Sequence, residues 1–292
     1  MSATWLQRLV VAEWWRRLVP VGVAAAVARP LSEAAVRFPA IRRRAEVNLE
    51  RVLGETDRRD EIPALAAPYL YENAMRWFLN FKADAIHKTS VKGREHAEHV
   101  VDDTGRGVIF SFMHIGTWMA LLALPGQLAE AGVEYALPVG FGQTAELSGW
   151  VGLWVAQGMR YLHEEANQVL AVGSYDRLRD VLNARGVVTL AFDVPGHAPA
   201  TMLGRHIGLK AGTARLSTET GAPVLPVQST LRRGRLVVEI LPPIEPAATL
   251  AETQANLATE MERLILARPE AVDHPTWRYV EMPPAPGAGP GE

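Results

Sequence analysis

The pattern of apolar and polar positions changes along the chain, and this change predicts a helical first part followed by an α/β part. Residues 1–60 are predicted to be helical, with breaks at Pro20, Pro30 and Pro39. The aromatic-rich stretch Ala64–Lys82 is predicted to form another helix, which either packs in the core or lines a lipid-facing groove.

From about residue 89, short apolar runs alternate with longer amphipathic stretches. Val108–Phe112 is a short apolar run next to Gly105 and Gly107, which is the pattern of a buried strand. Further strands are predicted at Tyr135–Val139, Val187–Phe192, Val224–Thr230 and Leu236–Leu241. Helices are predicted at Gly116–Ala129, Leu147–Gln157, Tyr175–Ala184, Thr213–Thr220 and Leu250–Ala267. This alternation predicts an α/β fold with a mainly parallel central sheet flanked by helices.

These patterns divide the chain of 292 residues into three parts. Residues 1–40 are predicted to form a basic amphipathic helical arm, and residues 41–280 one α/β domain. Residues 281–292, rich in proline and glycine, are predicted to be a disordered tail. The chain is long enough for one large domain with a full core.

The composition excludes several classes of protein and of site. Hydrophobic residues make up 48% of the chain and charged residues 21%, which is globular composition and excludes a disordered chain. There is no cysteine, which excludes disulfides, a thiolate nucleophile and cysteine-bound metal. No spacing of His, Asp and Glu indicates a metal site, and no glycine-rich nucleotide fingerprint follows a strand. We therefore expect no metal, no cofactor and no nucleic-acid partner.

The charge is distributed unevenly, although the net charge of the chain is only −2. Residues 1–51 hold nine arginines against four glutamates, so this part carries +5 and the remainder −7, which suggests an anionic partner surface. Trp5, Trp14 and Trp15 alternate with arginines, as in a helix lying at a bilayer interface, or in an ordinary amphipathic helix packed on the body. The apolar run Val19–Ala28 is shorter than the roughly 20 residues of a spanning helix. We therefore expect a cytoplasmic protein bound peripherally at the inner face of the cell membrane.

Two ionisable residues directly follow predicted strands. His114 comes just after Val108–Phe112, at the start of the next predicted helix, and Asp193 comes immediately after Val187–Phe192. Because ligands of open α/β sheets bind beyond the carboxyl ends of the strands, we expect both side chains in one crevice. A histidine takes a proton from an attacking hydroxyl or amine near neutral pH, and a nearby carboxylate orients its imidazole. The pair therefore predicts a general base with its orienting acid, although a lone histidine is more often structural.

Further candidates for substrate binding lie near these two positions. Thr117 is expected to cap a helix, and Gly196 to set a turn where backbone N–H groups approach a thioester carbonyl or a phosphate. Arg205 and Lys210 are candidates for gripping the phosphate of a phosphopantetheine arm, the alternative being solvated loop charges. Gly212–Thr213 is predicted to begin a helix whose amides hold an oxyanion or a phosphate, or simply to be a cap.

The segment Gly105–Met119, which reads GRGVIFSFMHIGTWM, resembles the active-site block of one enzyme family. These are the bacterial late acyltransferases of lipid A biosynthesis and their relatives, the phosphatidylinositol mannoside acyltransferases. Members typically read His-Phe-Gly-Asn-Trp-Glu where this chain has His114-Ile-Gly-Thr-Trp-Met119. Segments similar to other family blocks follow in family order at Asn48–Gly54, Val91–His96, Leu178–Gly196, Gly208–Val227 and Arg268–Trp277.

The resemblance implies a glycerolipid acyltransferase-like fold and transfer of a fatty acyl group to a hydroxyl of a membrane lipid, without cofactor or metal. In the family the histidine takes the acceptor's proton, supported by a carboxylate five residues later. Here that position is Met119, which cannot orient an imidazole. In one explanation another acid substitutes, with Asp193 as our candidate and Glu164 and Glu165 as weaker ones. In the other, the protein has left hydroxyl acylation behind.

We therefore expect an acyltransferase that moves a fatty acyl group from acyl-carrier protein or acyl-CoA to a hydroxyl or amine of a lipid or amphipathic metabolite. The expected catalytic residues are His114 and Asp193, and the arm is expected to contact the membrane surface. Two alternatives stay open. One is a non-catalytic protein that binds acyl chains or acyl carriers, and the other is a specialised-metabolite condensing enzyme on the same fold.

Overall fold

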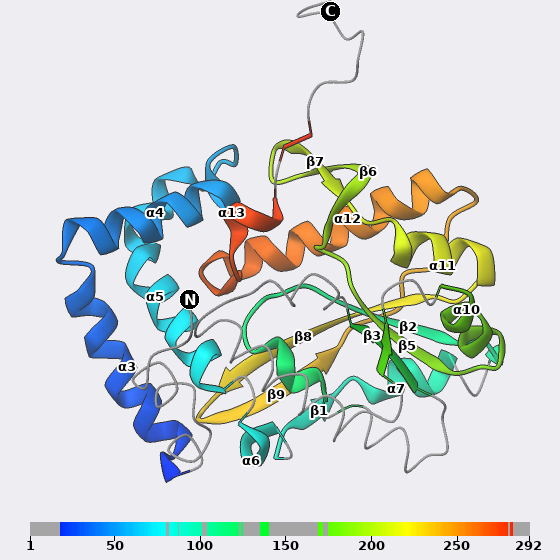
Figure 1. The fold of residues 1–292 in the computed structure, drawn as a ribbon, viewed down its shortest axis with the longest axis horizontal. Helices are drawn as coiled ribbons and strands as arrows, with labels where there is room; N and C mark the ends of the chain where they lie inside the picture. Colours follow the sequence, from blue (N-terminus) through cyan, green and yellow to red (C-terminus); the bar gives the residue numbers. More distant parts are fainter. Residues whose placement is uncertain are drawn as a thin grey trace, which may run out of the picture.

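The structure, a computed structural model, describes residues 18–79, 82–86, 88–100, 104–122, 124, 135–139, 169–171, 175–279 and 281–282. Its first part is helical and consists of α3 (Val21–Ala35), α4 (Pro39–Leu53), the 3-10 helix η1 (Arg59–Glu61) and α5 (Ile62–Leu79). These helices stand at one side of an α/β body (Figure 1).

The body is built around one sheet and a separate hairpin. The strands are β1 (Ser90–Lys92), β2 (Val108–Phe112), β3 (Tyr135–Val139), β4 (Val169–Ala171), β5 (Val187–Ala191), β6 (Pro195–Met202), β7 (Arg205–Leu209), β8 (Val224–Arg232) and β9 (Arg235–Ile240). The helices are α6 (Ala83–Ile86), α7 (Arg94–Glu98), η3 (Trp118–Leu122), α10 (Tyr175–Asn183), α11 (Gly212–Thr220), α12 (Leu250–Ala267), η5 (Pro269–Ala271) and α13 (Pro275–Arg278).

Seven strands form the central sheet in the order β1-β9-β8-β2-β5-β3-β4. Neighbouring strands are parallel except for β8 and β9, which form an antiparallel hairpin. The predicted α/β fold with a mainly parallel sheet flanked by helices is therefore confirmed. The central strands β2 and β5 pair in register from Val108 opposite Val187 to Phe112 opposite Ala191.

Helices cover the sheet on both faces, and the side chains of β2 alternate between the two cores. Ile109 packs in the core under α4, α10, α11 and α12, whereas Val108, Phe110 and Phe112 pack in the core beside α6, α7 and η3. All five residues of β2 are buried, as in a strand covered on both faces. This burial makes β2 a rigid support for whatever follows its carboxyl end.

Most predicted elements of the described part are confirmed. The strands at Val108–Phe112 and Tyr135–Val139 and the helix Leu250–Ala267 have the predicted bounds, and the other confirmed elements begin and end within three residues of theirs. The helix predicted at Leu147–Gln157 lies outside the described residues. The proposed disordered tail began too early, because Glu281 pairs with Ile207 of β7 as an isolated bridge.

Two predictions about helices were wrong. No break occurs at Pro30, which lies inside α3; a proline removes one backbone hydrogen bond, and the packing of α3 against α5 keeps the helix continuous. The helix predicted at Gly116–Ala129 does not begin at Gly116: its described part starts as the 3-10 helix Trp118–Leu122, and residues 125–129 lie outside the described residues. Gly116 has a φ of +62°, which an α-helix does not allow, and its N–H is bonded to the carbonyl of Ala271.

The hairpin β6–β7 was not predicted. Its strands contain Pro195, Gly196, Pro199 and Gly208, residues typical of turns rather than of strands. Its two-residue turn, Leu203–Gly204, has positive φ at both positions, which matches the right-handed twist of the strands it joins. The hairpin carries two of the predicted site residues, Gly196 and Arg205.

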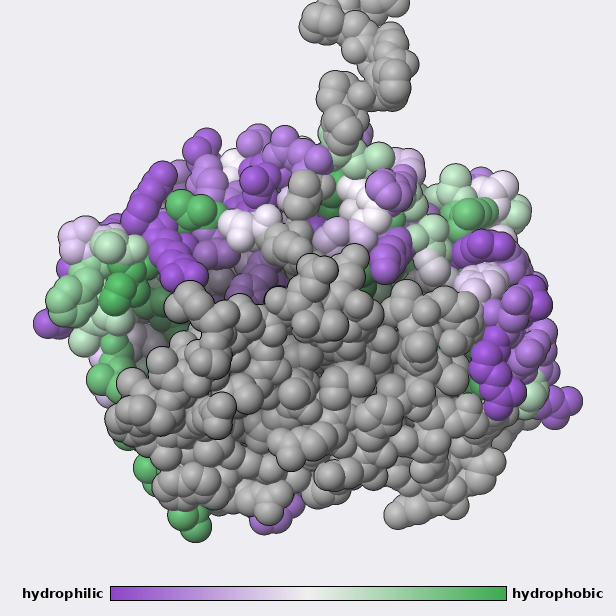
Figure 2. Space-filling model, in the orientation of Figure 1, coloured by the Kyte–Doolittle hydropathy of each residue, from purple (hydrophilic) through white to green (hydrophobic). Residues whose placement is uncertain are grey.

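The first helices leave apolar side chains exposed. Val23, Val27 and Leu31 of α3 are 52%, 53% and 63% exposed, and Phe38, which follows it, is 64% exposed. An apolar groove of about 490 Å³ runs between α3 and α5. Hydrophobic residues gather over this part of the surface (Figure 2). No helix among the described residues is long and apolar enough to cross a membrane.

Candidate active site

His114 and Asp193 lie side by side beyond the carboxyl ends of β2 and β5. These two strands are parallel and in register, so the residue that follows each strand by two positions reaches the same edge of the sheet. The N–H of Phe192 donates to the carbonyl of Phe112 at 2.8 Å, which extends the register past the last strand residue. The strand pairing thus places the imidazole and the carboxylate together.

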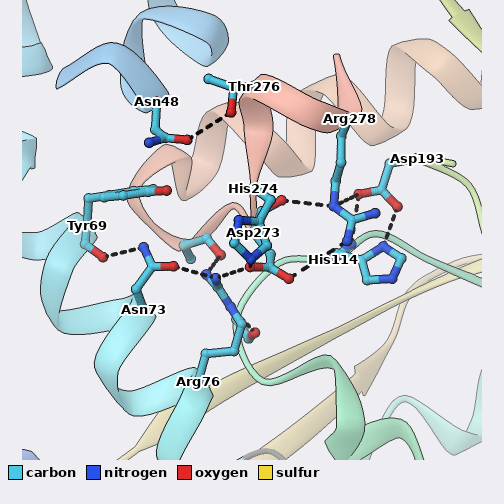
Figure 3. A network of polar contacts seen from close by, with 12 residues as sticks. Asn48, Tyr69, Asn73, Arg76, His114, Asp193, Asp273, His274, Thr276 and Arg278 are labelled. Atoms are coloured by element: carbon cyan, nitrogen blue, oxygen red, sulfur yellow. Dashed lines mark hydrogen bonds and ion pairs between the residues drawn. The ribbon is translucent and has the colours of Figure 1, made fainter. Parts of the chain in front are cut away.

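The Asp193 carboxylate bonds twice to His114. The ring Nδ1 lies 2.7 Å from Oδ1, and the His114 backbone N–H donates to Oδ2 at 3.0 Å. The predicted contact between the two side chains is therefore confirmed (Figure 3). Because one carboxylate oxygen binds the ring and the other binds the backbone N–H, Asp193 fixes both parts of His114.

The Asp193 side chain is 1% exposed, yet it is held in its charged form. Burial alone raises the pKa of this carboxyl. The charges of His114 and Arg278 and the two hydrogen bonds from His114 outweigh burial and hold the pKa at about 2. At neutral pH the carboxylate is therefore an acceptor, so it selects the ring tautomer that carries the proton on Nδ1.

The segment after η5 anchors the loop that carries His114. The N–H of Asp273 donates to the His114 carbonyl at 2.8 Å, and the Gly116 N–H donates to the Ala271 carbonyl at 2.9 Å. Between them, Ile115 and Val272 form an antiparallel bridge. A side chain at Gly116 would bring Cβ within 2.8 Å of the Ser229 carbonyl, so this close approach requires glycine. The imidazole is thereby held from both ends of its loop.

A buried network of charges continues from Asp193 through α13 to α5. Arg278 lies 3.8 Å from Asp193 Oδ2 and 3.7 Å from Asp273 Oδ2, and its Nε donates to the Asp273 carbonyl. Arg76 of α5 donates to Asp273 Oδ1 at 2.7 Å and to the Gly116 carbonyl at 2.9 Å. Burial raises the pKa of Asp273, but the charges of Arg76 and three neighbours lower it on balance. Both aspartates thus stay ionised because cationic side chains reach them inside the core, chiefly His114 at Asp193 and Arg76 at Asp273 (Figure 3).

Aromatic rings flank the imidazole on its other sides. The centroids of Phe112 and Trp118 lie 5.3 Å and 5.2 Å from that of His114. The His114 side chain keeps 15% of its surface exposed, in contrast to its acid partner. Tyr279 is buried close by, and desolvation followed by the charge of Asp193 raises its pKa well above the ordinary value. The histidine is therefore the accessible member of an otherwise enclosed polar group.

Thr117 and the start of α11 lie on elements adjoining the dyad. Thr117 is buried and directly precedes η3, and its carbonyl accepts the Ala120 N–H of that helix. The Lys210 N–H donates to the carbonyl of Val194, the residue that follows Asp193, so the backbone of Lys210 lies close to the pair. The side chain of Lys210 is exposed. The helix start predicted at Gly212–Thr213 is confirmed as the beginning of α11.

Arg205 is not placed to share a phosphate with Lys210. It pairs with Met202 next to the turn of the β6–β7 hairpin, whereas Leu209, before Lys210, pairs at the other end. Five residues of strand span roughly 16 Å. The Arg205 guanidinium is instead bound to Glu281 at 2.6 Å. The hairpin thus places the two candidate cations at opposite ends of one strand, and the structure does not bring them together.

Gly196 does not set an open turn. A Cβ there would lie 2.6 Å from the Leu209 carbonyl, so glycine is needed where the two strands of the hairpin approach each other.

Of the positions weighed for the missing acid, Glu164 and Glu165 lie outside the described residues, and Met119 is described only as part of η3. Asp193 is thus the candidate acid that the structure brings to the imidazole.

The network residues Arg76, Asp273 and Arg278 were not predicted. One signal for Arg76 was present, because a charged residue in the mostly apolar stretch Ala64–Lys82 needs a buried partner. Its partner Asp273 is 197 residues away in the chain, so no spacing rule connects them.

Comparisons with protein-family models and with curated proteins found no match to this chain. The site is therefore interpreted from its geometry and chemistry.

Proposed function

We propose that the protein is an acyltransferase on a glycerolipid acyltransferase-like fold. In this proposal it moves a fatty acyl group from acyl-carrier protein or acyl-CoA to a hydroxyl or amine of a lipid or amphipathic metabolite. The observation that carries the proposal is the doubly bonded His114–Asp193 pair beyond adjacent parallel strands. A base with a fixed tautomer and an ionised partner is what proton removal from a nucleophile requires.

The proposed reaction uses the ring nitrogen that faces away from Asp193. Because the carboxylate accepts the Nδ1 proton, Nε2 of His114 holds the lone pair that takes the proton from the acceptor O–H or N–H. The freed oxygen or nitrogen attacks the thioester carbonyl carbon, so that a C–O or C–N bond forms and the C–S bond breaks. Nε2 then returns the proton to the departing thiolate. Asp193 stabilises the imidazolium in between.

Asp193 compensates, in this proposal, for the absence of a carboxylate at Met119. A catalytic imidazole needs one acid at Nδ1, and this acid functions equally from its own helix or from the neighbouring strand. Arg278 lies against this carboxylate and acts as its positioning residue, whereas Asp273 contacts Arg278 and does not reach Asp193. What the proposed reaction requires is an acid at Nδ1, whatever its position in the sequence.

Peripheral attachment to a membrane surface is part of the proposal. The exposed apolar side chains of α3, such as Val27 and Leu31, and the groove beside them suit contact with acyl chains. Arginines follow in the next turns, at Arg37 and at Arg42–Arg44, where they suit anionic headgroups at the inner face of the cell membrane.

A thiol-release assay tests the enzymatic proposal. The full chain is incubated with long-chain acyl-CoA or acyl-carrier protein and a crude lipid and metabolite extract, and free thiol is followed over time. Because the chain has no cysteine, the enzyme itself adds no thiol to the signal. We expect release by the wild type, loss in His114→Ala, and retention in His206→Ala, an exposed histidine of β7.

The same assay separates the enzyme from a binding protein. Acylated product that depends on His114 supports the proposal and identifies the acceptor by its mass. Acyl-CoA binding without thiol release from any acceptor fraction, or release that is equal in His114→Ala, contradicts it.

A further inference from the structure

A second pocket, of about 450 Å³, lies between α4, η1, β7 and α13. Its charged lining consists of Arg43, Glu50, Arg51, Arg59, Arg205 and Glu281. Thr276 of α13 faces this pocket and bonds to Asn48 of α4, whereas Arg278 of the same helix turns toward Asp193 (Figure 3). The pocket is therefore distinct from the site around His114, with α13 between them.

Four guanidinium groups and two carboxylates line this pocket, and Glu55 lies 3.5 Å from Arg205 beside it, so the group carries an excess of one positive charge. Arg59 is paired with Glu50 at 2.7 Å, whereas Arg51 and Arg205 share Glu281. Arg43, Glu50 and Arg51 lie on one face of α4, at positions i, i+7 and i+8, with Val47 between them. Arg59 enters from η1 and Arg205 from β7. Because these arginines come from three different elements, they line the pocket from several sides. Arginines on a single solvated helix face would instead all point outward on one side.

The carboxylate of Glu281 already occupies this pocket as an anion. One of its oxygens accepts from Arg51 at 3.1 Å and from Arg205 at 2.6 Å. Two guanidinium groups on one oxyanion is the arrangement by which proteins bind phosphate. The Glu281 side chain is 58% exposed, so it is not locked in by packing and an incoming anion can displace it.

Arg205 is the buried base of the pocket. Its side chain is 12% exposed, and it is held by Glu281, by Glu55 at 3.5 Å and by the Glu50 carbonyl at 3.3 Å. Its Nε is buried and has no acceptor within the part of the chain that the structure describes. The groups of Arg205 that meet the pocket's anion are its terminal nitrogens, because Nη1 donates to Glu281 while Nη2 is held by Glu55 and the Glu50 carbonyl.

We propose that this pocket binds a phosphate group, which replaces the Glu281 carboxylate on Arg51 and Arg205 and recruits Arg43 and Arg59. A phosphomonoester offers three terminal oxygens and close to two negative charges, which matches several guanidinium groups better than a planar carboxylate does. This site does not depend on acyl transfer at His114. The shared chemistry is a phosphate monoester or inorganic phosphate, and its source is either a soluble molecule or a lipid headgroup.

The neighbourhood of the pocket suits either source. Ile41 of α4 lines the apolar groove with α3, while Arg43 of the same helix lines the arginine pocket. Figure 2 shows hydrophilic residues next to the hydrophobic area over α3 and α4. A headgroup at a bilayer interface would thus meet the arginines where acyl chains meet the groove.

Titration of the full chain tests the proposal without any acyl donor. Calorimetry follows binding of inorganic phosphate and of glycerol phosphate, and sedimentation follows vesicles of phosphatidylcholine with or without phosphatidic acid. We expect saturable binding that Arg51→Gln and Arg59→Gln each weaken about tenfold, because each removes a charge-assisted contact. Glu281→Gln should tighten binding several-fold, since it removes the competing carboxylate.

Arg263→Gln is the matched control, because Arg263 is an arginine that pairs with Glu260 on an exposed turn of α12. It should bind as the wild type does, and urea unfolding verifies that each variant is folded. Arg205→Gln is a poor test, because replacing Arg205 also removes its contacts with Glu55 and the Glu50 carbonyl, which hold the fold together. Binding of the soluble phosphates identifies a soluble ligand, and binding confined to phosphatidic acid vesicles identifies a headgroup.

Absence of saturable binding to every phosphate probe overturns the proposal. So does binding that Arg51→Gln and Arg59→Gln leave unchanged, or that Glu281→Gln weakens. Failure here leaves thiol release at His114 unaffected, and a failed thiol-release assay leaves phosphate binding unaffected, so the two proposals are tested separately.

Discussion

Replacing Asp193 by asparagine is the sharpest test of the His114–Asp193 pair. The pKa of about 2, against an ordinary value of 3.8, means that the folded protein favours the charged carboxylate by about 2 kcal/mol. If the charged carboxylate served only the stability of the fold, Asp193→Asn would lower the free energy of unfolding by about this amount and leave kcat of the folded protein nearly unchanged. If it also fixes the tautomer and stabilises the imidazolium, the loss of kcat should approach 10⁴-fold, as when the carboxylate of a catalytic triad is removed.

The measurement is kcat for thiol release by Asp193→Asn, with Asp273→Asn as the matched control. Asp273 is also a buried aspartate held by arginines, but its carboxylate contacts Arg76 and Arg278 and does not bond to the ring. We expect a fall of more than about 10³-fold for Asp193→Asn and less than about tenfold for Asp273→Asn, with each variant verified as folded. Equal losses in both variants, or a kcat that stays nearly unchanged in Asp193→Asn, would refute the assignment of Asp193 as the acid of the base.

Three further predictions concern stability and membrane contact. Arg76→Leu leaves the buried Asp273 carboxylate without its closest cation, so urea denaturation should show a loss of about 3–5 kcal/mol, and a loss below 1 kcal/mol contradicts this. Folding lowers the pKa of both Asp193 and Asp273, so their stabilisation is present above the ordinary pKa of 3.8 and is lost as pH falls below it, for Asp193 through its pKa of about 2. Urea midpoints should therefore fall steeply between about pH 4 and pH 2, and less steeply in Asp193→Asn. Leu31→Glu on α3 should reduce pelleting with anionic vesicles about tenfold, whereas Leu250→Glu, an exposed leucine of α12, should not; equal pelleting of both would argue against α3 as the contact.

The elements of the sheet could be predicted because their signals are local. A buried strand such as Val108–Phe112 is a short apolar run bounded by glycines, and a helix such as Leu250–Ala267 has its own capping box at Thr249. The contact between His114 and Asp193 followed from one general property of parallel sheets, that their carboxyl ends meet at one edge. That inference needed no distance information.

The parts that could not be predicted depend on contacts between distant segments. The hairpin β6–β7 is made of residues that favour turns, and its pairing, not its composition, makes it a sheet. Arg205 and Lys210 were named together as candidate phosphate contacts because they are close in sequence. The strand pairing instead places Arg205 next to the hairpin turn and Lys210 beyond the other end of β7. The anchoring of the His114 loop by Ala271 and Asp273 joins segments more than 150 residues apart. A local sequence pattern cannot predict a contact between segments so far apart in the chain.

The register of β2 and β5 explains why Asp193 meets His114 although the two residues lie 79 positions apart in the chain. Phe112 of β2 pairs with Ala191 of β5, so the residues two positions later, His114 and Asp193, lie next to each other. A carboxylate at Met119 would lie on η3, whose position depends on the turn at Gly116. The position of an acid after β5 instead depends first on strand pairing that the core already requires, and the contacts of the His114 loop with Ala271 and Asp273 add to it. Its geometry is therefore tied to the stability of the sheet, and loss of proton abstraction should accompany disruption of the β2–β5 pairing before it accompanies changes in η3.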